Sequence, residues 1–148
     1  MNLPNNHPGM VAANVAMVDH MREGRFLFGI GPGGLRSDME VFGNLDLDRN
    51  AMFVESIDQI LATWAGDAPY DVKGKFWNIS TRQTLIREAG QGVMVKPYQK
   101  PHPPIVVSVV VPHSKGVQAA AARGWTPITA NFLQPAWAAT HWPMYVKG

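Results

Sequence analysis

The sequence predicts an α/β fold in which helices alternate with the strands of a parallel sheet. The predicted order is helix, strand, helix, long excursion, strand, helix, strand, helix. Residues 105–111 are a nearly continuous run of valine and isoleucine, which is typical of a parallel strand buried on both faces. Two predicted strands end in turns rich in glycine or proline, at residues 31–34 and 112–116. Ligands bind at this edge of parallel sheets and barrels, so we expect the functional chemistry there.

The composition is that of a globular protein with a core. A length of 148 residues suits one domain, and hydrophobic and charged contents of 46% and 16% exclude a disordered chain. The net charge is +2 with scattered basic residues, so no nucleic-acid partner is expected. No cysteine is present, and neither a disulfide nor a metal site is expected. The chain shows no membrane-length apolar run and no signal-peptide pattern, so we expect a soluble, cytoplasmic protein without membrane contact.

The first predicted helix follows a loop at residues 1–8 that is rich in proline and asparagine. Its apolar positions recur at i, i+4 and i+7, and the helix ends at Gly24; these positions are Val11, Val15 and Val18. A strand is predicted at residues 25–30, a short apolar segment bounded by glycine on both sides. Asp19 lies on the apolar face of the helix, and Arg25 opens the strand. We expect these two side chains to form a buried or half-buried pair with a structural role.

The second predicted helix begins near Asp48 and ends at Gly66. Its core-facing stripe consists of Phe53, Ile57, Ile60, Leu61 and Trp64. Residues 67–100 then form a long excursion with a hairpin that turns near residues 73–74. Such excursions are often functional lids or covers. The proline-rich residues 96–104 are predicted to approach the next strand in an extended conformation.

The turn at residues 112–116 has the features of a phosphate-binding site. Ser114 can cap a helix predicted at residues 117–123, which leaves free amides, the helix dipole and Lys115 at one point. The alternative is an ordinary helix cap with a solvated lysine. The remaining predicted elements are a strand at residues 125–132 and a helix at residues 134–142.

The glycine turn at residues 29–34 formally satisfies the dinucleotide-binding pattern G-x-G-x-x-G through Gly29, Gly31 and Gly34. That pattern also needs a helix that opens at once and an acidic residue at the end of the next strand. Here Pro32 lies inside the motif, and no clear helical stripe begins before Met52. The sequence therefore does not favour a dinucleotide site.

Several segments occur in an order that resembles a known family. They are Leu3-Pro-Asn-Asn-His7-Pro8, Asp19-His-Met-Arg-Glu-Gly-Arg25, Phe28-Gly-Ile-Gly-Pro-Gly-Gly34, Phe42-Gly43, Phe76-Trp77, Lys96-Pro-Tyr-Gln-Lys-Pro-His-Pro-Pro104 and the β-branched strand before Ser114. Together they resemble the bacterial luciferase-like flavin-dependent monooxygenases, particularly the limonene and alkanal monooxygenase-like branch. The resemblance covers nearly the whole chain, and it rests on the order of the motifs rather than on any single one.

The resemblance implies a TIM-barrel-type fold of parallel β/α units, usually dimeric. An eight-stranded barrel takes about 250 residues. We therefore expect residues 1–148 to be a single partial luciferase-like domain, with an incomplete barrel of about four strands and the excursion at residues 67–100. Unpaired strand edges and uncovered apolar faces in such a barrel predict a homo-oligomer.

The resemblance also implies a cofactor, a reaction and site residues. Reduced FMN, supplied by a flavin reductase, would act with O2 on a small apolar substrate such as an aldehyde or terpene. His7 would be the catalytic candidate near the flavin, either positioning it or moving protons, although a loop histidine bonded to backbone is an equal alternative. The cofactor-binding residues would be Gly29, Gly31, Gly33 and Gly34 beside the ring, the phosphate turn of His113, Ser114, Lys115 and Gly116, and Asn131 after the next strand.

One departure from the family concerns the glycine turn. Some members carry there an arginine that reaches the FMN phosphate, whereas this chain has Pro32 at the corresponding position, and the role of the nearby Arg36 is open. Two other functions stay open beside the monooxygenase. The first is a non-catalytic flavin-binding or assembly module, which the partial barrel favours. The second is an oxidoreductase that uses a deazaflavin, since related barrels take that cofactor.

Overall fold

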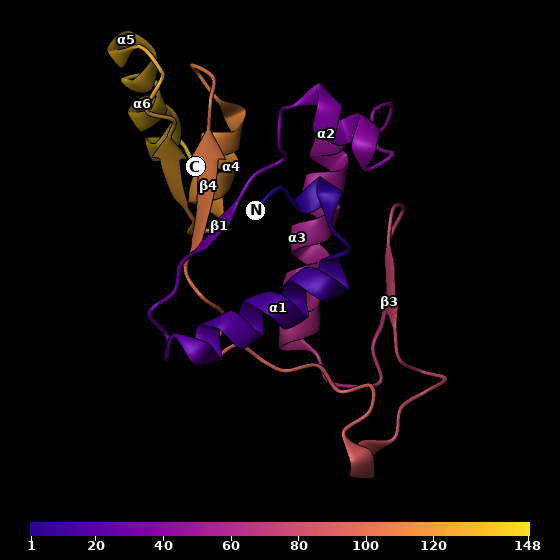
Figure 1. Cartoon of the computed structure of the whole chain (residues 1–148). Helices are drawn as coiled ribbons and strands as arrows, with labels where there is room; N and C mark the ends of the chain where they lie inside the picture. Colours follow the sequence, from indigo (N-terminus) through magenta and orange to yellow (C-terminus); the bar gives the residue numbers. More distant parts are fainter. The chain divides into compact units, whose positions relative to one another are not determined.

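The computed structural model describes residues 1–148 and divides by its internal contacts into two compact units (Figure 1). Unit 1 consists of Met1–Phe26 and Pro32–Pro103, and unit 2 consists of Leu27–Gly31 and Pro104–Gly148. That the whole chain forms a single domain stays a prediction. No helix of the chain has both the length and the apolar character needed to cross a lipid bilayer.

Unit 2 contains the predicted parallel sheet. Its strands are β1 (Phe28–Ile30), β4 (Ile105–Val109) and β5 (Thr126–Thr129), in the order β1-β4-β5. Ile30 is paired with Val107, and Val109 with Thr129, in parallel register on both sides of the central strand β4 (Figure 1). Four residues of β4 are buried, which confirms the prediction of a buried parallel strand. The sheet holds three strands, whereas about four were expected.

One helix of unit 2 packs against this sheet, and a second packs against that helix. The helix α4 (Lys115–Ala122) contacts β4, β5 and α6 (His141–Val146), and its apolar side chains Val117 and Ala120 are buried. The predicted helix at residues 134–142 is in fact two short helices, α5 (Pro135–Ala138) and α6. Pro143 explains the break, because proline has no N–H to donate to Ala139 and its ring would clash with that carbonyl in a continuous helix. A new helix that starts at His141 places Pro143 in a first turn, where no such bond is needed.

Unit 1 is built on the helices α1 (Pro8–Met21) and α3 (Arg49–Ala65), which pack against each other (Figure 1). Both were predicted from their apolar stripes, and the Trp64 indole Nε1 donates to the Ala12 carbonyl at 3.1 Å across their contact. Asp48 caps α3 by accepting from the Ala51 amide at 3.0 Å, at the position where the sequence predicts the helix to begin. A 3-10 turn, η1 (Leu3–Asn5), precedes α1 and contacts α3.

A short helix that the sequence did not predict, α2 (Arg36–Val41), lies between β1 and α3 in the chain. None of its residues is buried. An amphipathic stripe arises only where a helix buries one face, so this helix left no periodic signal.

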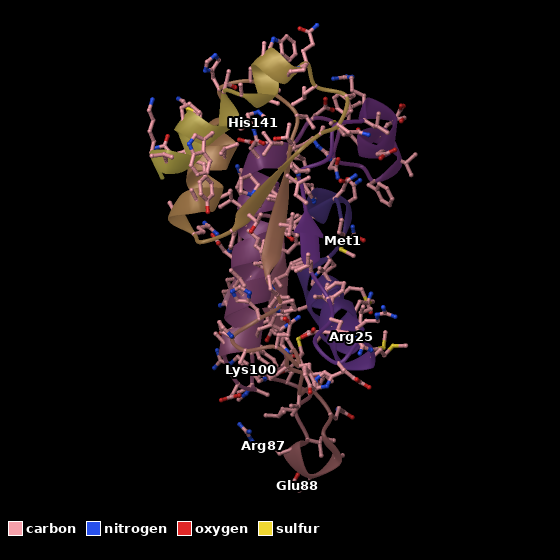
Figure 2. The ribbon with its side chains drawn as sticks, turned by 90° about the vertical axis from the view of Figure 1, so that its left-hand side faces the viewer. Met1, Arg25, Arg87, Glu88, Lys100 and His141 are labelled. Atoms are coloured by element: carbon pink, nitrogen blue, oxygen red, sulfur yellow. The ribbon has the colours of Figure 1, made fainter.

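The excursion of unit 1 contains the predicted hairpin, formed by the antiparallel strands β2 (Asp71–Lys73) and β3 (Asn78–Ser80). A small cluster of Ala68, Tyr70 and Ile79 stabilises its base, with Val72, Leu85 and Met94 packed against it. A second 3-10 turn, η2 (Arg87–Ala89), forms the far end of the segment, where Figure 2 labels Arg87 and Glu88.

The predicted pair of Asp19 and Arg25 is wrong. Asp19 is fully buried, and its carboxylate accepts from the Gln99 backbone amide and the Gln99 side-chain amide, both at 2.8 Å. Arg25, labelled in Figure 2, has a side chain that is 72% exposed and lies 3.8 Å from Glu23 in a surface ion pair. The buried carboxylate therefore fastens α1 to the extended segment at residues 96–104 and not to the strand. Gln99 also donates to the Phe26 carbonyl at 2.9 Å. The partner of the buried carboxylate is thus a neutral amide, where the sequence predicted an arginine.

Candidate functional site

The carboxyl ends of β1, β4 and β5 bring most of the predicted cofactor-binding residues to one edge of unit 2. Gly29 and Gly31 lie on and just after β1, His113 to Gly116 follow β4, and Asn131 follows β5. The three strands are adjacent and parallel, so their carboxyl ends share the same edge. This is the edge at which parallel sheets bind ligands.

The two strand glycines have different surroundings. A Cβ added at Gly31 would lie 2.5 Å from the Ser108 Oγ, so a side chain there would need this hydroxyl to move aside. A Cβ added at Gly29 would meet nothing within 4 Å. The packing of the sheet therefore leaves room for a side chain at position 29, yet the residue there is glycine. The absence of a side chain keeps the surface of the sheet flat at that point.

The turn between β4 and α4 is held by a local cap. Ser114 accepts from the Gly116 amide at 3.2 Å as the N-cap of α4, which confirms the predicted cap. His113 adopts a left-handed conformation with φ of 50°. The first amides of α4 and the exposed Lys115 therefore gather at a helix N-terminus, where backbone donors and the helix dipole favour an anion.

A second set of contacts holds the same turn from the corner between α5 and α6. The Thr140 hydroxyl accepts from the His113 amide at 2.9 Å. His141, labelled in Figure 2, is buried, and its Nε2 lies 2.8 Å from the Val111 carbonyl, while its Nδ1 lies 2.8 Å from the Thr129 hydroxyl. A carbonyl only accepts, so Nε2 carries a hydrogen, and in the neutral ring Nδ1 accepts from Thr129.

We call this arrangement of Thr140 and His141 the corner clamp. It links the ends of β4 and β5 to the turn that precedes α4. Sequence analysis missed both residues, and the only trace of the corner in the sequence is Pro143, which is disfavoured in the interior of a continuous helix.

The remaining predicted residues, His7, Gly33 and Gly34, belong to unit 1. His7 caps α1, with Nδ1 accepting from the Gly9 amide at 3.1 Å. This is the backbone-bonded role that the sequence left open, and it places the hydrogen of a neutral ring on Nε2.

The loop that contains Gly33 is fastened by Arg49, which sequence analysis also missed. Gly33 has φ of 73°, and a Cβ there would lie 2.5 Å from the Arg49 Nη2. Arg49 donates to the Pro32 carbonyl and, at 2.8 Å, to the Asn44 Oδ1. A Cβ at Gly34 would meet nothing within 4 Å, so this glycine is not required by packing.

The sequence matches the model of the luciferase-like monooxygenase family over residues 1–143. It is 39% identical over 69 residues to 4-hydroxyprotoasukamycin monooxygenase of Streptomyces nodosus subsp. asukaensis, which covers 47% of this chain and 19% of that protein. It is 36% identical over 67 residues to limonene 1,2-monooxygenase of Rhodococcus erythropolis, which covers 45% of this chain and 17% of that protein.

Two solved structures share the fold. One is the oxygenating constituent of 3,6-diketocamphane monooxygenase of Pseudomonas putida, a type II Baeyer-Villiger monooxygenase in complex with FMN, with a TM-score of 0.84 and 24% identity over 99% of this chain. The other is the monooxygenase RslO1 of Streptomyces bottropensis, with a TM-score of 0.77 and 22% identity over 97% of this chain. The chain spans 41% and 40% of these two structures. Its parallel β/α units are thus those of an incomplete barrel, as predicted.

Proposed function

Because this chain belongs to the luciferase-like monooxygenase family, we propose that it is a flavin-dependent monooxygenase domain that holds FMN at the carboxyl edge of its β1-β4-β5 sheet. The observation that carries the proposal is the turn at residues 112–116, which is capped from within by Ser114 and held from outside by the corner clamp. The substrate class we propose is a small apolar molecule, such as an aldehyde or a terpene.

The residues of the turn fit the phosphate of FMN. A phosphate is a dianion that needs several donors, and the start of α4 offers backbone amides, the Ser114 hydroxyl and the Lys115 ammonium group. His113 would lie beside the same group, and Gly116 leaves space there, since it has no side chain. The turn is preorganised, because Ser114, Thr140 and His141 hold it by contacts that need no ligand.

The strand glycines fit the other end of the cofactor. An isoalloxazine ring is flat and apolar on its faces, and Gly29 presents backbone without a side chain on the same sheet. Gly31 and Asn131 follow the two flanking strands and would lie along the ring. Gly33, Gly34 and His7 belong to unit 1, and a role of these residues in flavin binding stays a prediction from the family resemblance.

Reduced FMN, when bound, would supply the two electrons with which O2 is cleaved, one oxygen atom entering the substrate and the other leaving as water. The protein would orient the cofactor and keep water from the reacting atoms. A separate flavin reductase would provide the reduced cofactor. We also propose association between copies of the chain, since β1 and β5 are the two edge strands of the sheet and open strand edges tend to pair.

The test of the phosphate turn is a comparison of FMN with riboflavin, which lacks the phosphate. We expect the double substitution Ser114→Ala and Lys115→Ala to weaken FMN binding by about 10- to 100-fold, because one or two charge-assisted hydrogen bonds are lost. Riboflavin binding should weaken by less than about 2-fold. Lys73→Ala is the matched control, since it removes an exposed lysine from β2. Equal weakening of both flavins would refute the assignment.

The same titrations separate the candidate functions. Absence of binding by any flavin would refute the FMN proposal, and binding of a deazaflavin in preference to FMN would favour the deazaflavin-dependent oxidoreductase. Substrate-dependent consumption of O2 with reduced FMN identifies a monooxygenase, whereas production of hydrogen peroxide alone points to a non-catalytic flavin-binding module.

A further inference from the structure

The helix α6 exposes aromatic and aliphatic side chains that neither the sheet nor the corner clamp uses. It packs on α4, and α4 packs on the sheet, so the side of α6 that carries its exposed residues is an outer surface of unit 2. Trp142 and Val146 lie four residues apart, on one side of the helix, and are 69% and 65% exposed. The Tyr145 ring stacks on Trp142 with ring centroids 5.9 Å apart. We call these three residues the outer face of α6.

Two further aromatic rings are exposed in the segment before α6. Phe132 follows β5 and is 74% exposed, and Trp137 of α5 is 47% exposed. Trp137 is joined to the start of α6, since its carbonyl accepts from the Thr140 hydroxyl at 2.6 Å. Tryptophan and tyrosine combine an apolar ring with a polar N–H or O–H, which suits them to a boundary between water and an apolar phase. The chain around α6 is therefore rich in side chains that are typical of such a boundary.

The charged side chains of unit 2 all have the same sign. The eleven aspartate and glutamate residues of the chain belong to unit 1, whereas unit 2 carries Lys115, Arg123 and Lys147. Lys147 directly follows α6 and is exposed. Arg123 lies over the Trp125 ring, 4.9 Å from its centroid. A lysine or arginine near an anionic surface is attracted to it, and unit 2 has no carboxylate to oppose that attraction.

We propose that the outer face of α6 binds the surface of an anionic lipid bilayer. Trp142 and Val146 enter the boundary between headgroups and acyl chains, and Lys147 contacts the headgroups. The buried apolar area is small, so the binding is reversible. The expectation of no membrane contact rested on the lack of a membrane-length apolar run, and binding at the surface needs no such run. None of these residues is proposed to touch the flavin, so the proposal does not rest on the flavin site.

Two other partners fit this surface less well. Nucleic acid is bound by neutralising many phosphates, and unit 2 offers only three cationic side chains beside a mainly apolar face. In a pair of copies joined through α6, both partners would bring the same positive charge to the contact. An anionic bilayer instead takes up the apolar side chains and attracts the cations.

Cosedimentation of the full chain with lipid vesicles tests the proposal. We expect binding to vesicles of phosphatidylcholine with about 30% phosphatidylserine at millimolar lipid concentrations. Binding to phosphatidylcholine alone should be at least about 10-fold weaker, because each cation near an anionic surface contributes about 5-fold. Raising the salt concentration from about 0.1 M to about 0.5 M should remove most of this difference.

Variants separate the apolar contribution from the electrostatic one. Trp142→Ala should weaken binding to both kinds of vesicle by about 10-fold, since a large apolar ring no longer leaves water. Lys147→Glu should weaken binding to the anionic vesicles by about 10- to 25-fold and binding to the neutral ones by less than about 2-fold. The matched controls in unit 1 are Phe42→Ala, which removes a ring that is 56% exposed, and Lys73→Glu. Both controls should change binding by less than about 2-fold.

A second variant of the outer face guards against misfolding of the first. Val146→Asp keeps the stacked pair of Trp142 and Tyr145 and places a negative charge on the face, so it should abolish vesicle binding while circular dichroism stays unchanged. Lack of cosedimentation with anionic vesicles up to about 5 mM lipid, or binding that neither Trp142→Ala nor Val146→Asp weakens, would overturn the proposal. Without vesicle binding, capture of a single-stranded DNA oligonucleotide would identify nucleic acid as the partner. A lower molecular mass of Trp142→Ala in sedimentation equilibrium would then identify a second copy, and either result would also overturn the proposal.

Discussion

Replacing Asp19 by asparagine tests how α1 is joined to the rest of unit 1. The buried carboxylate accepts from both the backbone and the side-chain amide of Gln99, at 2.8 Å each. Asparagine has nearly the same shape, but one of its two terminal groups is an NH2 that cannot accept. One of the two Gln99 donors would therefore face another donor beside a buried side chain. We expect Asp19→Asn to destabilise the folded chain.

The size of the effect follows from the two bonds. A hydrogen bond to a charged group contributes about 1.5–3 kcal/mol, and a buried donor left unpaired costs about 1–3 kcal/mol. One bond is lost and the other becomes neutral, which gives a loss of about 2–4 kcal/mol in the free energy of unfolding. For a chain of this length, such a loss lowers Tm by on the order of 10 °C.

Urea and thermal unfolding followed by circular dichroism measure this loss, and two further variants locate its origin. Arg25→Gln is the control, because the exposed pair of Arg25 with Glu23 should contribute less than about 0.5 kcal/mol. In a double-mutant cycle, Asp19→Asn and Gln99→Ala should couple by about 1–2 kcal/mol, while Asp19→Asn and Arg25→Gln should be additive. Strong coupling of Asp19 to Arg25, or an Asp19→Asn effect below about 0.5 kcal/mol, would refute this assignment of the buried carboxylate.

Three further predictions concern the edge of the sheet and the turn that follows β4. Gly29→Ala should change the free energy of unfolding by less than about 1 kcal/mol, since the new Cβ meets nothing within 4 Å. It should nevertheless weaken FMN binding, because the new methyl group would stand where the ring is proposed to lie. Unchanged FMN affinity would contradict this position of the ring. Gly31→Ala forces the Ser108 Oγ away from the new Cβ, so we expect a loss of about 0.5–1.5 kcal/mol in chemical denaturation, which Ser108→Gly should relieve. His141→Phe should keep the ring volume but leave the Val111 carbonyl unpaired, so we expect a loss of about 1–3 kcal/mol and weaker FMN binding; unaltered FMN binding would contradict a role of the corner clamp in the turn.

The sequence predicts those elements whose signal is periodic and local. The helices α1 and α3 each bury one apolar stripe. The recurrence of apolar residues every three or four positions reveals these helices without any knowledge of the surface they pack against. The strand β4 is buried on both faces and is recognised by its unbroken β-branched run. The helix α2 buries nothing and therefore could not be found in this way.

Polar contacts between distant segments were not predictable, and the Asp19 error shows why. An acidic residue on an apolar stripe indicates that a partner exists, but the nearest basic residue in sequence is only one candidate among many. The partner, Gln99, is neutral and lies 80 residues away. Glu55 is a similar case, because the groups it binds are backbone amides of the hairpin turn, which carry no sequence signature at all.

The turn at residues 112–116 has both kinds of contact, local ones that the sequence predicts and distant ones that it does not. The Ser114 cap spans two residues and follows from local chemistry, so the sequence located it. The left-handed conformation of His113, however, costs about 1–2 kcal/mol for a residue with a side chain. The bond from its amide to Thr140, 27 residues away, offsets that cost, and His141 secures the strand end before it. The shape of the turn is therefore set as much by the corner between α5 and α6 as by the residues that would touch the phosphate. Substitutions at Thr140 should consequently alter FMN affinity even though this residue lies outside the turn.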